Sequence, residues 1–158
     1  MLLYHGSNMV IEHPRLISPQ RLLDFGSGFY LTSDLEQAKR WAKRTQTMRN
    51  TGTSVVSVFE FDEQMLTRLE VLSFNSPNLE WLRFVVSNRS GKPTNAQYDI
   101  VHGPVANDQT IRTINDFQNG YLTADIAIQL LLPQKLKGQY AFKTEAALEC
   151  LHFTEGLV

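Results

Sequence analysis

The stretch Phe25-Gly26-Ser27-Gly28-Phe29-Tyr30-Leu31-Thr32 decides how the rest of this chain is interpreted. Two glycines one residue apart let the backbone turn tightly, because glycine adopts positive φ without a steric penalty. The turn then delivers the aromatic ring of Tyr30 at a fixed place. Since glycine pairs recur in many loops, this loop alone does not indicate a function and has to be interpreted together with the other segments of the chain.

A helix is predicted directly after this loop. Ser33-Asp34 provides an N-cap, and apolar residues follow at helical spacing, so the sequence predicts an amphipathic helix from about Leu35 to Gln46. The outward side and the exit of this helix carry a run of basic residues, namely Lys39, Arg40, Lys43, Arg44 and Arg49. Such a run is usually a solvated face, but it is also the one place where an acidic macromolecule could dock.

The remaining segments predict a mixed α+β fold. Residues 10–23, interrupted by Pro14 and Pro19, are expected to form a loop. Strands are predicted over residues 2–5, 53–61, 69–74, 98–105, 138–142 and 151–153, and helices over 79–86, 107–116, 123–132 and a short turn at 144–148. Strands and helices alternate irregularly without repeats or linkers, which indicates a single α+β domain spanning residues 1–158.

Composition excludes several classes of protein. With 15 Lys and Arg against 16 Asp and Glu, the net charge is -1, so no overall basic field attracts nucleic acid. The single cysteine, Cys150, cannot form an internal disulfide and is predicted to be buried. The four histidines have no metal-ligand spacing, so no metal is expected. There is no leader-like N-terminus and no apolar run of membrane-spanning length, so we expect a cytoplasmic protein without membrane contact.

Three segments together carry a family resemblance. They are Leu3-Tyr4-His5-Gly6-Ser7, the glycine loop ending in Tyr30, and Gln139-Tyr140-Ala141-Phe142. In this order they resemble the three-part signature of ADP-ribosyltransferases of the diphtheria-toxin and poly(ADP-ribose) polymerase branch. The chain looks closest to a small bacterial family of that superfamily, whose members share a segment like Tyr98 to Asp108 here.

The resemblance implies a fold and a set of binding residues. The fold would be a pair of split antiparallel sheets with NAD between them. His5 would bind the adenosine ribose, the backbone of Gly6 would pair with the nicotinamide carboxamide, and Tyr30 would stack on the nicotinamide ring. Trp41, eleven residues after Tyr30, would close the sandwich from the helix. Ser7 and Gly28 complete the expected NAD-binding residues.

The third position departs from the best-known enzymes. Active members usually carry Glu where this chain has Gln139. A neutral amide keeps a hydrogen bond to the nicotinamide ribose but loses the charge that stabilises a cationic transition state, a loss of about 3 kcal/mol. Glu145 is the nearest carboxylate in sequence, but Thr144-Glu145 is more typical of an N-cap and a first-turn acid.

Charged residues near the glycine loop suggest further contacts. Arg15 is expected to contact the pyrophosphate of NAD, Arg21 to be solvated, and Asp24 to shape the entrance.

The resemblance implies a mono-ADP-ribosyltransferase with catalytic residues His5, Tyr30 and Gln139. Its substrate would be NAD, and the acceptor a protein or nucleic acid. A small chain of this kind suits the toxin of a bacterial toxin-antitoxin pair, whose partner would be an antitoxin protein. Two alternatives stay open: a non-catalytic module that binds NAD or ADP-ribose, and an RNA-modifying phosphotransferase on a similar fold.

Overall fold

A run rich in valine and phenylalanine forms the central strand of the first sheet. The computed structural model describes residues 1–17, 22–92 and 97–158. Within them, β3 (Val55–Phe61) is the centre of a three-stranded sheet and pairs with β1 (Leu2–Ser7) on one side and β7 (Leu151–Leu157) on the other. Both pairings are antiparallel.

The second sheet has four strands in the order β2 (Phe29–Leu31), β6 (Gly138–Phe142), β5 (Ile100–Pro104) and β4 (Val71–Ser73). β6 pairs antiparallel with both β2 and β5, whereas β4 runs parallel to β5. The expectation of purely antiparallel sheets is therefore wrong at the β4 edge. The chain reaches β5 from β4 through a helix, and such a crossover connection returns the strand in the parallel direction.

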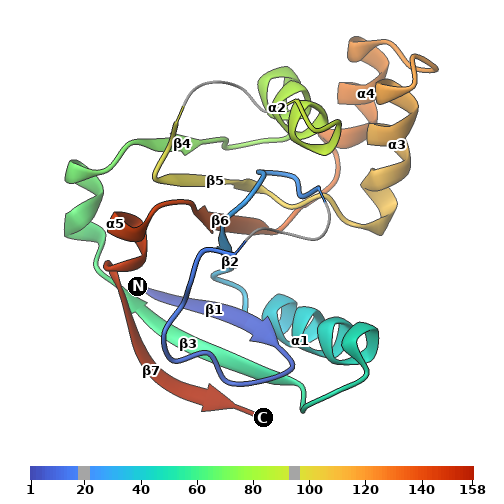
Figure 1. Ribbon diagram of the computed structural model, residues 1–158. Helices are drawn as coiled ribbons and strands as arrows, with labels where there is room; N and C mark the ends of the chain where they lie inside the picture. The colour runs from blue at the N-terminus through green and yellow to red at the C-terminus, as the bar shows by residue number, and fades with distance from the viewer. Residues whose placement is uncertain (18–21, 93–96) are drawn as a thin grey trace.

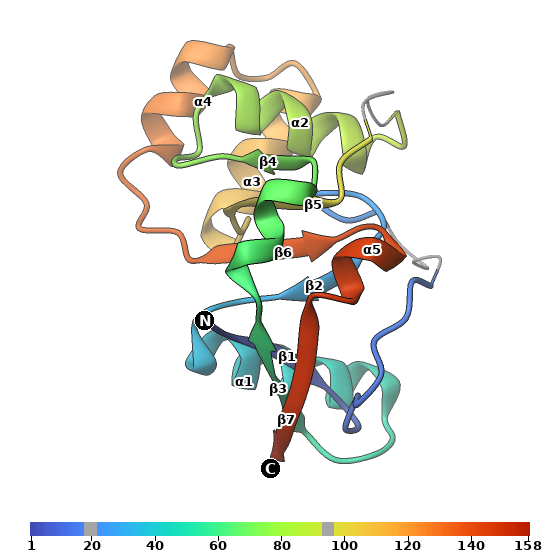
Figure 2. The same ribbon diagram turned by 90° about the vertical axis from the view of Figure 1, so that its left-hand side faces the viewer.

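Among residues 1–17, 22–92 and 97–158, one isolated backbone bridge joins the two sheets. Tyr4 of β1 and Thr32, directly after β2, exchange two hydrogen bonds of 2.8 and 3.0 Å. Figure 2 shows β1, β3 and β7 in the lower part of the molecule and the second sheet above them.

Helices cover the sheets separately. α1 (Leu35–Arg49) packs on β1 and β3, while α2 (Leu79–Arg89), α3 (Asp108–Gln118) and α4 (Ala124–Leu131) gather at the far end of the second sheet (Figure 1). Side chains cap the N-termini of the three longest helices: Asp34 for α1, Asn78 for α2 and Asn107 for α3. These caps satisfy backbone N–H groups that a helix leaves without internal partners.

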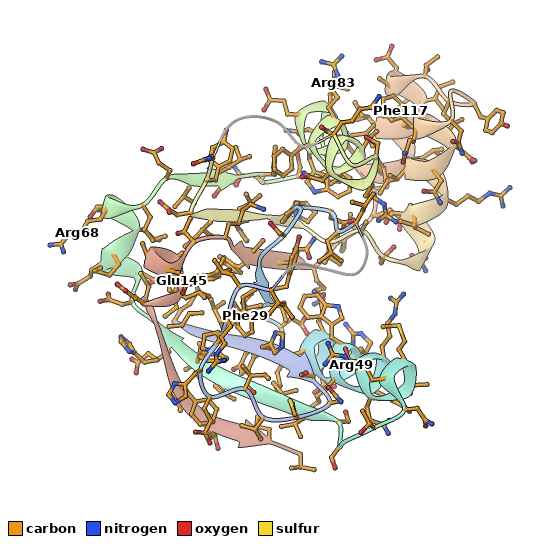
Figure 3. The ribbon with its side chains drawn as sticks, in the orientation of Figure 1. Phe29, Arg49, Arg68, Arg83, Phe117 and Glu145 are labelled. Carbon is orange, nitrogen blue, oxygen red and sulfur yellow. The ribbon has the colours of Figure 1, made fainter. Side chains whose placement is uncertain are left out.

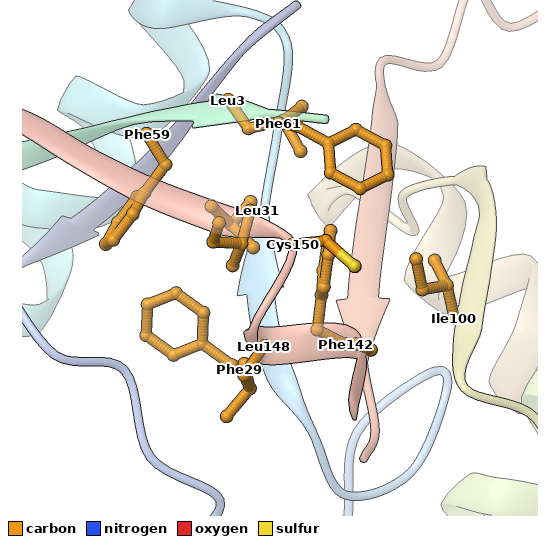
Figure 4. Close-up of a cluster of buried hydrophobic side chains, with 11 residues drawn as sticks. Leu3, Phe29, Leu31, Phe59, Phe61, Ile100, Phe142, Leu148 and Cys150 are labelled. Carbon is orange, nitrogen blue, oxygen red and sulfur yellow. The ribbon is translucent and has the colours of Figure 1, made fainter. Parts of the chain in front are cut away.

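The hydrophobic core is divided between the two faces of the second sheet. One cluster lies between the sheets and includes Leu3, Phe29, Leu31, Phe59 and Phe142 (Figure 4). Another lies under α2, α3 and α4 and is built around Trp81 and Phe25.

The elements differ from the sequence prediction mainly in length. β2 lies where the sequence predicts a loop, β7 runs four residues beyond the predicted end, and α1 continues to Arg49. A short 3-10 helix, η1 (Glu63–Arg68), stands where only a strand end is predicted, and α5 (Glu145–Leu148) forms as expected. In the described part of the chain, no helix has the length and apolar character needed to cross a bilayer.

Candidate functional site

The backbone bridge between Tyr4 and Thr32 is isolated, and we call the place beyond it, between Gly6 of β1 and Tyr30 of β2, the fork. Backbone polar groups of alternate residues in a strand point to the same side. Because Tyr4 bonds to Thr32, the N–H and C=O of Gly6, two residues on, face the fork and not β3. Continued pairing would join Gly6 to Tyr30. Within the described chain, however, neither polar group of Gly6 has a hydrogen-bond partner.

The side chain of His5 bonds to the Tyr30 carbonyl, the group that Gly6 would meet if the ladder continued. Its Nδ1 lies 2.8 Å from the carbonyl oxygen of Tyr30, and its ring stacks on Phe29 with centroids 4.2 Å apart. A carbonyl only accepts, so Nδ1 carries the proton. Burial lowers the pKa of His5, and the nearby charge of Arg49 lowers it further. The ring is therefore neutral near pH 7, with Nε2 as an acceptor.

Gly6 also permits the close approach of α1. A Cβ at this position would lie 2.0 Å from the carbonyl oxygen of Ala38 and 2.6 Å from the backbone nitrogen of Ala42. Only glycine fits beneath the helix, because any side chain would push α1 away from β1. The same residue thus brings α1 close to β1 and leaves two polar groups facing the fork.

Trp41 is a partly buried residue of α1, next to Ala42, whose backbone nitrogen lies close to Gly6. It follows Gln37 by four residues, about one helical turn, and therefore lies on the same side of α1. Gln37 is only 4% exposed, and its Nε2 has no hydrogen-bond partner among the described residues. Sequence reasoning missed Gln37, since a polar residue in the first turn of a helix looks like surface.

Tyr30 and the glycine loop hold each other in place. The Tyr30 hydroxyl donates to the carbonyl of Gly26 at 2.7 Å and accepts from the N–H of Phe25 at 3.1 Å. Burial raises the pKa of Tyr30, so the hydroxyl keeps its proton. Lys143 Nζ donates to the carbonyls of Phe25 and Ser27, each at 2.6 Å. The loop adopts the expected positive φ at Gly26, 77°.

Gln139 lies in the first part of β6, on the same face as Ala141, which pairs with Tyr30. Its side chain is 4% exposed and its Nε2 donates to Asp24 Oδ2 at 3.4 Å. Asp24 in turn accepts from Arg89 at 2.7 Å. The structure thus places a carboxylate beside the neutral residue that stands at the third signature position.

The other residues expected near the site lie in the loop after β1, outside the described residues, or in a strand pairing. Arg15 is exposed in the loop after β1, and Arg21 lies outside the described residues. The basic side chain beside His5 is Arg49, whose Nη1 donates to Asn8 Oδ1 at 2.8 Å. Ser7 is buried and paired to β3.

Gly28 has a packing role. A Cβ there would lie 2.9 Å from the carbonyl oxygen of Phe142, so glycine lets the loop rest against β6.

Two sequence interpretations are confirmed. Cys150 is buried, at 1% exposure. Glu145 is exposed in the first turn of α5, behind the N-cap Thr144, and Figure 3 places it far from Arg49 of α1. Among the described residues, no group of three His, Cys, Asp or Glu side chains could hold a metal.

A surface depression of about 440 Å³ lies at η1, away from the fork; it is lined by Met1, Glu60, Phe61, Asp62, Glu63, Gln64 and His152.

Comparison with known proteins gives one match. The model of a family described as "Protein of unknown function (DUF3990)" matches residues 1–153 of this chain. No curated protein and no solved structure matches it.

Proposed function

We propose that this chain, which belongs to the DUF3990 family, is a mono-ADP-ribosyltransferase of the split-sheet type that takes NAD as its substrate. The observation that carries the proposal is the pair of unpartnered backbone groups of Gly6 at the fork, as seen within the described chain. A buried polar backbone group without a partner is costly and uncommon in folded proteins. Gly6 therefore marks a place that a ligand is expected to complete.

A primary carboxamide matches the groups of Gly6. It offers one carbonyl acceptor and one N–H donor side by side, as a neighbouring strand would. Nicotinamide carries such a carboxamide on a flat, electron-poor ring. Tyr30 of β2 and Trp41 of α1 would supply the aromatic faces on which such a ring stacks.

The opposite end of NAD would lie toward His5. Its neutral ring presents Nε2 as an acceptor for a ribose hydroxyl, because Nδ1 is already bonded to Tyr30. Arg49, close to His5, would supply positive charge for the phosphates. In this assignment Arg49 replaces Arg15, which is exposed in the loop after β1.

The proposed reaction breaks the bond between the ribose C1′ and the nicotinamide nitrogen. The bonding electron pair leaves with nicotinamide, and the acceptor's oxygen or nitrogen forms the new bond to C1′ while its proton passes to solvent. Gln139 accepts a hydrogen bond from a ribose hydroxyl and orients the sugar. Its neutral amide makes hydrolysis slow and chain elongation absent, so transfer stops at one ADP-ribose unit.

The test combines calorimetric titration of NAD with an assay for nicotinamide release. Tyr30→Ala is expected to weaken NAD binding by about 1–3 kcal/mol, the range for a lost aromatic stack. Tyr30→Phe is the matched control, because it removes the loop hydrogen bonds but keeps the ring. Equal affinity in folded Tyr30→Ala and wild-type protein would contradict the assignment of the pocket.

A non-catalytic NAD-binding module is the second candidate, favoured by the neutral amide of Gln139. It predicts NAD binding without nicotinamide release under any condition, including in the presence of cell extract as a source of acceptors. An active enzyme instead yields ADP-ribosylated protein or nucleic acid, detectable by mass spectrometry. A cytoplasmic toxin with a protein antitoxin is the cellular setting that we propose for that activity.

A further inference from the structure

We infer that Asp24 is a positioning residue that orients and polarises the amide of Gln139. The inference rests on the function proposed above and adds a residue that the three signature segments do not contain. It explains how a site with a neutral side chain at position 139 can retain negative charge near the ribose.

The contacts of Asp24 place its carboxylate behind the Gln139 amide. Oδ2 accepts from Gln139 Nε2 at 3.4 Å and from the N–H of Ala106 at 3.2 Å. Oδ1 accepts from Arg89 Nη1 at 2.7 Å. The Asp24 side chain is only 12% exposed, so water screens this charge weakly.

An ionised carboxylate only accepts hydrogen bonds, and this fixes the orientation of the amide. Gln139 must turn its NH₂ group toward Asp24, which leaves Oε1 as the free acceptor. A ribose hydroxyl can donate a hydrogen bond to Oε1 of Gln139. It could not donate to the NH₂ group if the amide were turned the other way. The carboxylate also polarises the amide, because hydrogen bonds in a chain strengthen one another.

Arg89 keeps Asp24 in this position. The ion pair joins the start of the glycine loop to the last turn of α2. Asp24 therefore has both a structural anchor and a contact with the candidate site, and the experiment has to separate the two.

The same geometry predicts the effect of Gln139→Glu. That substitution would put a second carboxylate next to Asp24, and two like charges so close disfavour ionisation of both. The negative charge can thus be at position 24 or at position 139, but not at both without a penalty. Exchanging the charges of positions 24 and 139 therefore tests the contact, because the double variant should have a higher kcat than Asp24→Asn and a higher melting temperature than Gln139→Glu.

Four proteins are compared: wild type, Asp24→Asn, Gln139→Glu and the double variant. Steady-state nicotinamide release gives kcat and KM, calorimetry gives the Kd for NAD, and thermal melting reports folding. Asp24→Asn is expected to lower kcat by about tenfold or more, equivalent to about 1.4 kcal/mol, with the Kd for NAD changed less than about threefold.

The double variant should recover kcat, because the amide introduced at position 24 can donate to the carboxylate introduced at position 139. Gln139→Glu alone should melt at a lower temperature than the double variant, since only the single variant holds two carboxylates side by side.

Lys137→Met is the matched control for the loss of an ion pair. It removes the 2.7 Å contact between Lys137 and Asp34 at the start of β6 without touching Asp24. If this control and Asp24→Asn lose kcat equally, the role of Asp24 is structural and the inference is wrong. Wild-type kcat in Asp24→Asn also overturns it and leaves the proposed function intact. Absence of NAD binding to the wild-type protein would instead overturn the proposed function itself.

If Asp24→Asn does not fold, the comparison of Gln139→Glu with the double variant still tests whether positions 24 and 139 are in contact. A shared contact requires that Asp24→Asn relieve the effect of Gln139→Glu on melting temperature and on kcat. Additive losses would show that positions 24 and 139 act independently, which contradicts the inference.

Discussion

At the scale of single residues, the tautomer of His5 is the feature with the clearest consequence. Burial lowers the pKa of this ring below its ordinary value of 6.5, and its Nδ1 proton is committed to Tyr30. Nε2 accepts a hydrogen bond only while the ring is neutral. We therefore expect NAD affinity to be constant at neutral pH and to fall only below pH 6.5, as calorimetry on both sides of that pH would show.

His5→Gln supplies the control for this prediction. Its amide does not titrate in this range, so its weakened affinity should not vary with pH. The stability of the fold should also depend on the protonation of His5. Between the lowered pKa of the folded state and 6.5, the unfolded chain binds more protons than the folded chain. The free energy of unfolding therefore rises with pH through that window and is constant above it. A wild-type affinity that falls as the pH rises above 6.5 would contradict the neutral ring.

At the scale of elements, the glycine loop is held by Tyr30 of β2 and by a lysine that directly follows β6. Lys143, directly after β6, donates to the carbonyls of Phe25 and Ser27. Burial lowers the pKa of its ammonium group. The contact with the Phe25 carbonyl is partly buried, whereas the Ser27 carbonyl is exposed and can bond to water if Lys143 is replaced. Lys143→Met should destabilise the fold by about 1–3 kcal/mol, the cost of leaving the partly buried carbonyl of Phe25 without a donor.

Hydrogen exchange localises this effect. Amides of residues 25–28 should exchange faster in Lys143→Met, while those of α1 should not change. Lys43→Met, on the exposed side of α1, is the matched control and should melt close to the wild type. If the loop amides were equally protected in both variants, Lys143 would not be what holds the loop.

At the scale of the whole molecule, one isolated bridge joins the two sheets in the described part of the chain, and the fork lies beyond it. A ligand that completes the fork bonds to groups of both sheets and binds only the folded state. At a hundredfold excess over its Kd, NAD should therefore add about 2.7 kcal/mol to the free energy of unfolding.

The fork predicts where the protection lies. Saturating nicotinamide should slow exchange of the Gly6 amide, which faces the fork without a partner among the described residues. The amide of Gly120, in the turn after α3, is the internal control and should not change. Slower exchange at Gly120 with no change at Gly6 would place the ligand elsewhere.

Elements with local causes could be predicted from the amino-acid sequence alone. Caps at Asp34 and Asn107 begin helices where they are predicted, and the β-branched run at residues 55–61 forms the central strand. The ordered segments around His5, Tyr30 and Gln139 are linked in the structure, because His5 bonds to the carbonyl of Tyr30 and Tyr30 pairs with Ala141, two residues after Gln139; their shared role in NAD binding stays a prediction. Hydrogen bonds between near neighbours and the periodicity of apolar residues decide such features, and both can be seen in a single segment.

Contacts between distant segments could be found only in the folded chain. β2 is three residues long and exists because β6 pairs with it and Tyr4 bonds to Thr32 directly after it, so no local pattern predicts it. Asp24 meets Gln139 across 115 positions of sequence. The open groups of Gly6 likewise result from the place where two sheets part. Because these contacts depend on how strands are ordered in space, and not on the chemistry of any one segment, folding alone reveals them.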